Sequence, residues 1–317
     1  MKLIGIVYLL FFAIFSHAQT NYPNHPIRLV IPFPPGGGAD ITARILTQKI
    51  SESTGQPFVI EYKAGAAGNI AAEYVAKAPN DGYTLLLATN GLVIQPHLQK
   101  VSWDPLKDFQ AISTFANYSL VIAIQPKLPF NTMSDLVNFA KANPNQLTYG
   151  SSGSGGPLHI GVELFCNQAG IKMLHVPYKG NAPMNVGLLS GDIDMVFDSP
   201  MGPLQNIRLG KAKAIATTGK KRSHVLPDVP TVAESVLPNF SYETWNAILA
   251  PAGTPREIVK KLNQEIIKAV ANPDVQASLI KIGYEPQSST PEEFEQLMKI
   301  EYQRFGKLII ENKIKLD

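Results

Sequence analysis

The chain has 317 residues, a formal net charge of +3 at pH 7 and one cysteine. So weak a positive charge argues against a nucleic-acid partner, which requires a strongly basic surface, and a single cysteine cannot close an internal disulfide. That cysteine, Cys166, lies in an apolar helical stretch and is expected to be a buried structural thiol. The length is sufficient for two lobes.

The first eighteen residues have the composition of a secretory signal peptide. Met1-Lys2 gives a positive start, residues 3–15 are uncharged and apolar, and Ser16-His17-Ala18 ends the segment in the small-x-small pattern of a cleavage site. No later apolar run approaches the roughly 20 residues that a spanning helix needs. We therefore expect a signal peptide over residues 1–18, export to the periplasm, and no membrane insertion of the mature chain.

Strand-like and helix-like segments then alternate along the chain. Short apolar runs predict strands, and apolar residues at helical spacing predict helices. In chain order we expect a strand at 27–33, a turn at 34–38, a helix at 40–53, a strand at 58–61, a helix at 68–77 and a strand at 83–88. This order predicts a mainly parallel sheet with right-handed crossovers.

A second α/β unit of similar size follows. Its expected strands are 120–125, 147–150, 173–176, 194–198 and 212–217, and its expected helices are 132–142, 157–169 and 182–190. Two segments, Thr254–Glu257 and Thr290–Glu293, have the pattern of capping boxes with proline at the first helical position, and each predicts a C-terminal helix. Because these helices need a sheet to cover, we expect the chain to return to the first lobe near residues 242–251.

The expected organisation therefore has two crossings between the lobes. They lie near residues 120 and 245 and form a two-strand hinge. The predicted limits are residues 19–120 together with 246–317 for the first lobe and residues 121–245 for the second.

Motifs of enzyme chemistry are absent from the sequence. There is no phosphate-binding loop, no dinucleotide-binding G-x-G-x-x-G, no G-x-S-x-G, and no paired cysteine or histidine ligands for a metal. We expect no cofactor and no metal. A hydrolytic triad of Ser154, His159 and Asp198 is conceivable, but a nucleophile needs a strained elbow and an oriented base. A histidine near a helix start is more often a packing or hydrogen-bonding group.

The informative residues are glycine-rich loops that follow strands and precede helices. They are Pro34–Asp40, Ser151–Gly156, Tyr178–Ala182 and, in similar form, Thr89–Gly91. Ligands of open α/β sheets bind outside the carboxyl ends of the strands, where glycines admit a ligand to the backbone and helix starts offer unpaired N–H groups to an anion. One such loop alone is often just a turn. Several loops on two facing units predict an anion site between them.

The charged residues of these loops keep two interpretations each. Asp40 lies at a helix start and is either a cap or part of the site. Lys179 is a second anion contact or a solvated side chain. Asp198 receives a ligand donor or closes the turn after its strand.

A set of segments spread over essentially the whole mature chain matches one known pattern. They are Tyr22-Pro23, residues 26–40, 64–70, 81–86 and 149–155 with His159, residues 175–180, Phe197-Asp198, and residues 226–231, 250–255 and 290–294. In these segments the chain resembles the Bug family, the receptor proteins of tripartite tricarboxylate transporters. Three segments depart from the family pattern, at residues 61–63, 157–158 and 199–201, and they leave the identity of the ligand open.

The resemblance implies a two-lobed, type II-like periplasmic binding protein that closes on its ligand and catalyses no reaction. It implies a small carboxylate ligand, permease subunits of a tripartite tricarboxylate transporter as partners, and a monomer. The ligand-binding residues that it implies, together with those of the loops above, are Phe33, Gly36, Gly37, Gly38, Ala39, Asp40, Thr89, Asn90, Ser152, Gly153, Ser154, His159, Lys179, Gly180, Asn181, Ala182 and Asp198. Two alternatives remain open from the residues: a ligand-sensing subunit of a signalling receptor, and a secreted hydrolase.

Overall fold

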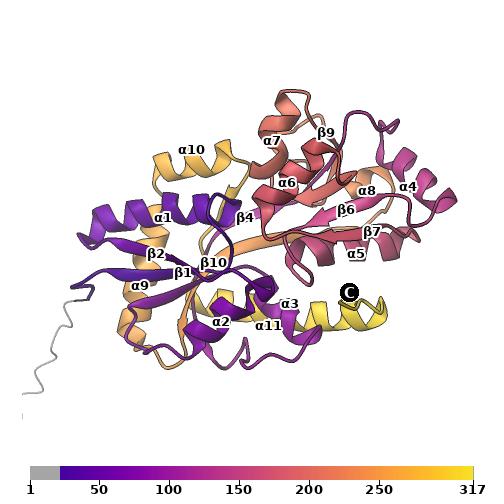
Figure 1. The fold of residues 1–317 in the computed structure, drawn as a ribbon. Coiled ribbons are helices and arrows are strands. Elements are labelled where there is room, and N and C mark those ends of the chain that lie inside the picture. Colours follow the sequence, from indigo (N-terminus) through magenta and orange to yellow (C-terminus); the bar gives the residue numbers. More distant parts are fainter. Residues whose placement is uncertain (1–21, 317) are drawn as a thin grey trace, which may run out of the picture.

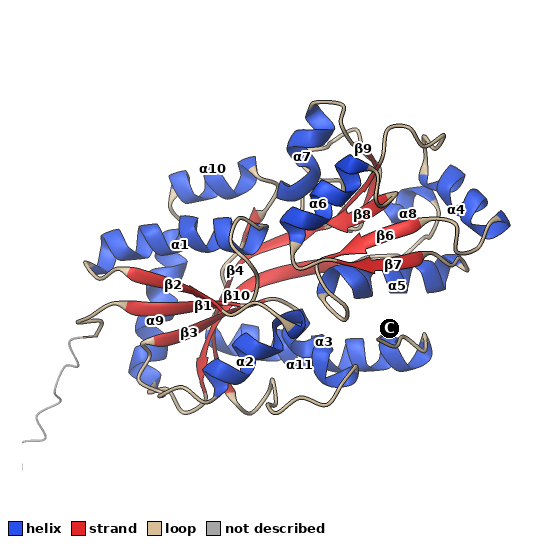
Figure 2. Ribbon diagram, in the orientation of Figure 1, coloured by secondary structure: helices blue, strands red, loops and turns tan. Residues whose placement is uncertain are grey.

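The computed structural model describes residues 22–316, and the expected signal peptide, residues 1–18, lies outside them. The described chain forms two α/β lobes that lie side by side (Figure 1). Each lobe is a sheet with helices on its faces (Figure 2). The predicted fold class is therefore confirmed. No described helix is both long and apolar enough to cross a membrane.

The first lobe is built on a six-stranded sheet in the order β11-β4-β10-β3-β1-β2. The strands are β1 (Ile27–Ile31), β2 (Phe58–Tyr62), β3 (Thr84–Ala88), β4 (Phe109–Ser119), β10 (Glu243–Pro251) and β11 (Glu285–Pro286). Strand β1 pairs in parallel with β2 and β3. Helices lie on both faces and bury the apolar side chains of β1 and β3.

The second lobe has a five-stranded sheet in the order β7-β6-β8-β5-β9. The strands are β5 (Val121–Ile124), β6 (Thr148–Ser151), β7 (Leu174–Pro177), β8 (Met195–Asp198) and β9 (Lys213–Thr217). All five were predicted from the sequence to within two residues at each end. Strands β7, β6 and β8 run parallel, so their carboxyl ends meet at one edge of the sheet.

Both sheets are mixed, and the prediction of mainly parallel sheets is wrong in this respect. Strand β10 runs antiparallel to β3 and β4, and β5 runs antiparallel to β8 and β9. The reason is the hinge, because the chain leaves the first lobe along β4 and returns beside it along β10. The pairing of β10 with β4 starts at Glu243 and Ser119 and has register shifts at Asn246/Ala247 and Ile248/Leu249.

The residue limits predicted for the lobes stay a proposal. They agree with the strands at the first crossing, where β4 ends at Ser119 and β5 begins at Val121. At the second crossing, β10 begins at Glu243, three residues before the proposed limit at residue 246. The crossing strands are thus part of the first sheet along most of their length.

The described helices lie between these strands in the chain or follow the last of them. They are α1 (Gly38–Thr54), α2 (Asn69–Ala76), α3 (Gly91–Ile94), α4 (Met133–Ala142), α5 (Pro157–Ala169), α6 (Asn181–Ser190), α7 (Met201–Arg208), α8 (Val232–Ser235), α9 (Arg256–Val270), α10 (Pro273–Lys281) and α11 (Pro291–Glu311), with 3₁₀ turns η1 (Ala66–Gly68) and η2 (Gln95–His97). Helix α5 has the predicted bounds. Its Cys166 is buried, and burial raises the pKa of this thiol, as expected of a structural cysteine.

The two predicted capping boxes have different outcomes. At α11, Thr290 accepts the Glu293 N–H and the Glu293 carboxylate accepts the Thr290 N–H, so this box is confirmed. At α9 the prediction is wrong, because the Thr254 hydroxyl donates to the Pro251 carbonyl and Pro255 occupies the N-cap. The helix begins one residue later than the box requires, so Thr254 lies before the N-cap.

Replacing Thr290 with alanine should destabilise the protein by about 1 kcal/mol, because the first turn of α11 loses its side-chain cap. Thr290→Ser keeps the hydroxyl and should retain most of the stability. Urea denaturation followed by circular dichroism measures both variants. Equal stability of the alanine and serine variants would contradict this role of the hydroxyl.

Candidate functional site

Two adjoining cavities lie between the lobes. The inner cavity has a volume of about 30 Å³ and is lined by Phe33, Gly37, Gly38, Ala39, Thr89, Tyr118, Ser152, Pro157, Leu158, Asn181, Ser199 and Tyr284. The outer cavity, of about 610 Å³, is lined by Pro32, Phe33, Pro34, Ala64, Gly65, Ala66, Ala67, Gly68, Ser152, Gly153, Ser154, Tyr178, Lys179 and Gly180. Phe33 from the first lobe and Ser152 from the second line both.

Three helices begin at the inner cavity with the same kind of N-terminus. The N-cap residues of α1, α5 and α6 are Gly37, Gly156 and Gly180, and none of these helices has a side-chain cap. Helices α4, α8, α10 and α11 are instead capped by a Thr or Asn side chain. Uncapped helix starts leave backbone N–H groups and the positive end of the helix dipole for an anion.

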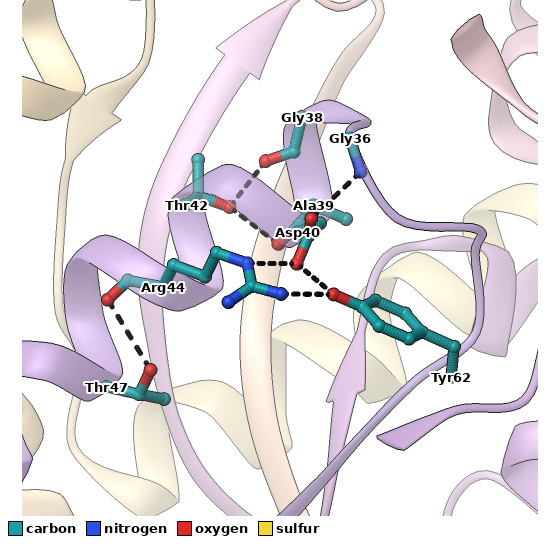
Figure 3. A network of polar contacts seen from close by, with 8 residues as sticks. All are labelled: Gly36, Gly38, Ala39, Asp40, Thr42, Arg44, Thr47 and Tyr62. Atoms are coloured by element: carbon teal, nitrogen blue, oxygen red, sulfur yellow. Dashed lines mark hydrogen bonds and ion pairs between the residues drawn. The ribbon is translucent and has the colours of Figure 1, made fainter. Parts of the chain in front are cut away.

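Asp40 stabilises the first of these loops from behind. Its carboxylate accepts the Gly36 N–H at 2.9 Å, the Arg44 guanidinium at 2.9 Å and the Tyr62 hydroxyl at 2.7 Å (Figure 3). The Asp40 side chain is buried and lines neither cavity. Asp40 therefore holds the start of α1 in place, and the Arg44 guanidinium compensates the negative charge of its carboxylate.

Asp198 plays the corresponding part in the second lobe. It is fully buried at the end of β8 and accepts hydrogen bonds from the side-chain amides of Asn181 and Asn185 and from the N–H and hydroxyl of Ser199. Burial raises the pKa of its carboxyl to about 6, against the opposing effect of these donors. Asp198 thus holds Asn181 and Ser199, which do line the inner cavity.

Two tyrosines at this site escaped the sequence analysis. Tyr118, at the end of β4, and Tyr284, just before β11, have ring centroids 4.6 Å apart and line the inner cavity. Burial raises the pKa of both hydroxyls, so each stays a neutral hydrogen-bond donor. Ser199, a hydrogen-bond partner of Tyr284, was also missed.

The structure brings together about half of the residues predicted for the site at the inner cavity. These are Phe33, Gly37, Gly38, Ala39, Thr89, Ser152 and Asn181. The outer cavity adds Gly153, Ser154, Lys179 and Gly180, with Lys179 exposed at its wall. The remaining predicted residues line neither cavity: Gly36, Asp40, Asn90, His159, Ala182 and Asp198.

Asn90 is one of the predicted residues that face away from the cavities. It is fully buried, accepts the Thr244 hydroxyl at 2.6 Å and donates to the Glu243 carbonyl at 3.5 Å. It therefore ties the loop after β3 to the hinge strand β10. This contact could not be predicted from the loop's own residues, because residues far apart in the chain decide which way a loop side chain points.

Two of the three residues of the conceivable hydrolytic triad, His159 and Asp198, have partners outside the triad. His159 is buried, accepts the Gly155 N–H on Nδ1 at 3.0 Å and stacks on His175 with ring centroids 4.1 Å apart. Asp198 is occupied by amide and hydroxyl donors, as described above. Ser154 lines the outer cavity. The imidazole is thus a packed acceptor in the loop before α5.

The lobes are in direct contact around the cavities. A Cβ added to Gly180 would lie 3.1 Å from Pro34 of the first lobe, and one added to Gly38 would lie 3.1 Å from the Ser199 hydroxyl of the second lobe. Such close approach describes a closed arrangement. The inner cavity then has room for little more than one or two water-sized groups.

Similarity to known proteins covers nearly the whole chain. Residues 42–314 match the model of the tripartite tricarboxylate transporter family receptors. The "UPF0065 protein in tcbD-tcbE intergenic region" of Pseudomonas sp. (strain P51) is 39% identical over 295 residues, which are 92% of this chain and 88% of that protein.

Solved structures give the same result. Rpa4515 of R. palustris, with adipate, has a TM-score of 0.89 and 33% identity, covering 93% of this chain and 99% of that one. The periplasmic binding protein BugD has a TM-score of 0.88 and 31% identity, covering 93% and 99%.

The pH dependence of stability should contain a contribution from Asp198. Because its folded pKa, about 6, exceeds the ordinary value of 3.8, the folded state binds more protons between these values and this contribution falls as pH rises from about 4 to 6. In urea titrations, the free energy of unfolding of the wild type relative to Asp198→Asn should therefore fall across this window by about 2–3 kcal/mol. Asp228→Asn, at an exposed residue, is the control. A difference that is constant with pH would contradict the assignment.

Proposed function

Since this chain belongs to the receptor family of tripartite tricarboxylate transporters, we propose that it captures a small carboxylate between its lobes and delivers it to the permease of such a transporter. The family and the fold are those of binding receptors and not of enzymes. BugD, a solved structure similar to this chain, is a periplasmic binding protein. For this chain we propose the same compartment, reached through the signal peptide at residues 1–18, and a monomeric state.

One observation carries the proposal. Three helix starts with glycine N-caps, one from the first lobe and two from the second, meet at the inner cavity without a side-chain cap. Each offers N–H donors and about half a positive charge to an anion. A carboxylate at this position touches both lobes, and therefore favours the closed form over the open one.

The two cavities suggest how the ligand is divided between them. The inner cavity suits one carboxylate, because Ser152, Asn181 and the Tyr118 and Tyr284 hydroxyls add side-chain donors to the helix starts. The outer cavity falls within the size range of ordinary small-molecule sites. It takes the rest of the ligand against Phe33, the proline and glycine backbone, and the serines of the second lobe.

This division favours short-chain mono- and dicarboxylic acids over bulky or cationic compounds. The adipate in the structure of Rpa4515 is a ligand of this class. Ligand-specific contacts are proposed for the segments that depart from the family pattern, because Leu158 and Ser199 both line the inner cavity.

Isothermal titration calorimetry against a panel of mono-, di- and tricarboxylates should give at least one saturable ligand. The dimethyl ester of that acid should bind far more weakly, because it lacks the charge that the helix starts stabilise. Lack of binding by every acid of the panel, together with turnover of an ester, would overturn the proposal in favour of a hydrolase.

A matched pair of glycine variants tests closure around the ligand. Gly38→Ala places a methyl group 3.1 Å from the Ser199 hydroxyl of the second lobe and, within its own lobe, on the Tyr284 hydroxyl that lines the inner cavity, so it should disturb the closed cavity and weaken carboxylate binding at least tenfold. Gly37→Ala has negative φ and no atom closer than 3.9 Å to the added methyl, so it should bind nearly as the wild type does. Equal effects of the two variants in calorimetry would refute the closed geometry as the binding form.

A further inference from the structure

A buried glutamine joins the two lobes beside the ligand cavities. Gln95 begins η2, six residues after the cavity residue Thr89, and its side chain is 1% exposed. Its Nε2 donates to the Gly155 carbonyl of the second lobe at 2.7 Å. This is a direct hydrogen bond between the lobes, made to the loop Ser151–Gly156 that carries Ser152 into both cavities.

The orientation of Gln95 is fixed by its other contacts. Its Oε1 accepts from the amides of Asn69, at 3.1 Å, and Gln99, at 2.6 Å. With two donors on the oxygen, the side-chain nitrogen must face the second lobe. Asn69 and Gln95 also line a small cavity, of about 20 Å³, that shares Phe33 and Thr89 with the inner cavity.

Gly155 is held from both sides of the interface. Its N–H donates to His159 in its own lobe, at 3.0 Å, while its carbonyl accepts from Gln95 in the other. Its φ of +77° favours glycine, and an added methyl would lie 2.8 Å from Leu316 and 2.9 Å from Gln95 Nε2. The loop thus fits closely against the first lobe when the lobes are together.

We infer that Gln95 is a positioning residue for ligand retention: its hydrogen bond to Gly155 latches the loop Ser151–Gly156 to the first lobe in the closed form. The latch touches no ligand. It slows opening, and it keeps Ser152 at the junction of the two cavities. The ligand measurement below rests on the proposed function, whereas the exchange measurement does not.

Gln95→Glu is the sharpest variant. It preserves the size of the side chain and the acceptor for Asn69 and Gln99, but it replaces the donor to Gly155 with an oxygen that faces a carbonyl. Gln99→Ala is the matched control, because it removes one donor to Gln95 while Asn69 still binds the same oxygen and the Gly155 carbonyl still accepts from the nitrogen.

In the ligand-free full-length mature protein, hydrogen–deuterium exchange should be about fivefold faster over residues 152–159 in Gln95→Glu than in the wild type. The exchange over residues 213–217, in β9, should not change, and Gln99→Ala should match the wild type in both segments. Unchanged exchange at residues 152–159 in Gln95→Glu would overturn the latch, as would equal acceleration in both variants.

Adipate is the probe for retention, with stopped-flow tryptophan fluorescence as the readout. Gln95→Glu should raise the dissociation rate constant about five- to tenfold and leave the association rate constant within a factor of two. A variant that slows association and leaves dissociation unchanged would contradict the inference. If the wild type binds no carboxylate at all, the proposed function fails, and the exchange experiment alone decides on the latch.

Discussion

The structure depends on one constraint: a backbone N–H that is removed from water has to be hydrogen-bonded. Several helices on the outside of the molecule meet it with a side chain, as Thr290 does for α11. The helices that begin between the lobes have glycine where such a side chain would be. Under the proposed function, an anionic ligand completes these donors, and closure of the lobes then depends on that ligand.

The ionised side chains near the cleft support this arrangement from behind. Asp40 accepts hydrogen bonds from Gly36 and Tyr62, Asp198 accepts them from Asn185 and Ser199, and neither carboxylate lines a cavity. A carboxylate directed into the cleft would repel an anionic ligand. Because both carboxylates point away from the cavities, Asp40 orders the glycine loop and Asp198 orders the Asn181 amide. Neither places a negative charge where an acid is proposed to bind.

The sequence was sufficient for the alternation of strands and helices, for the bounds of α5 and for the loops at the carboxyl ends of the strands, because each depends on local pattern. It was insufficient for β4, where Ser113, Thr114 and Asn117 interrupt the apolar run that marks a buried strand. Tyr118 and Tyr284 were missed for a related reason. They come from segments 166 residues apart, and only the pairing of β4 with β11 brings them together.

The direction in which each loop side chain points could not be predicted from the sequence either. Asn90 and Thr89 are neighbours in one loop, yet Thr89 lines the inner cavity while Asn90 bonds to the hinge strand. The capping pattern before α9 failed because the helix begins one residue later than predicted, with Pro255 at the N-cap. For Asn90, a contact with a distant segment decides the direction of the side chain, and the local pattern does not contain that contact.

The pairing of β4 with β10 determines what kind of motion the molecule allows. The two crossing segments are hydrogen-bonded to each other as far as Ser119 and Glu243, so they behave as a ribbon and not as two independent tethers. A ribbon resists shear in its own plane, which would break its ladder, but it twists and bends across its flat face, above all at irregularities in register. The lobes are therefore expected to rotate about this ribbon more easily than they slide past each other.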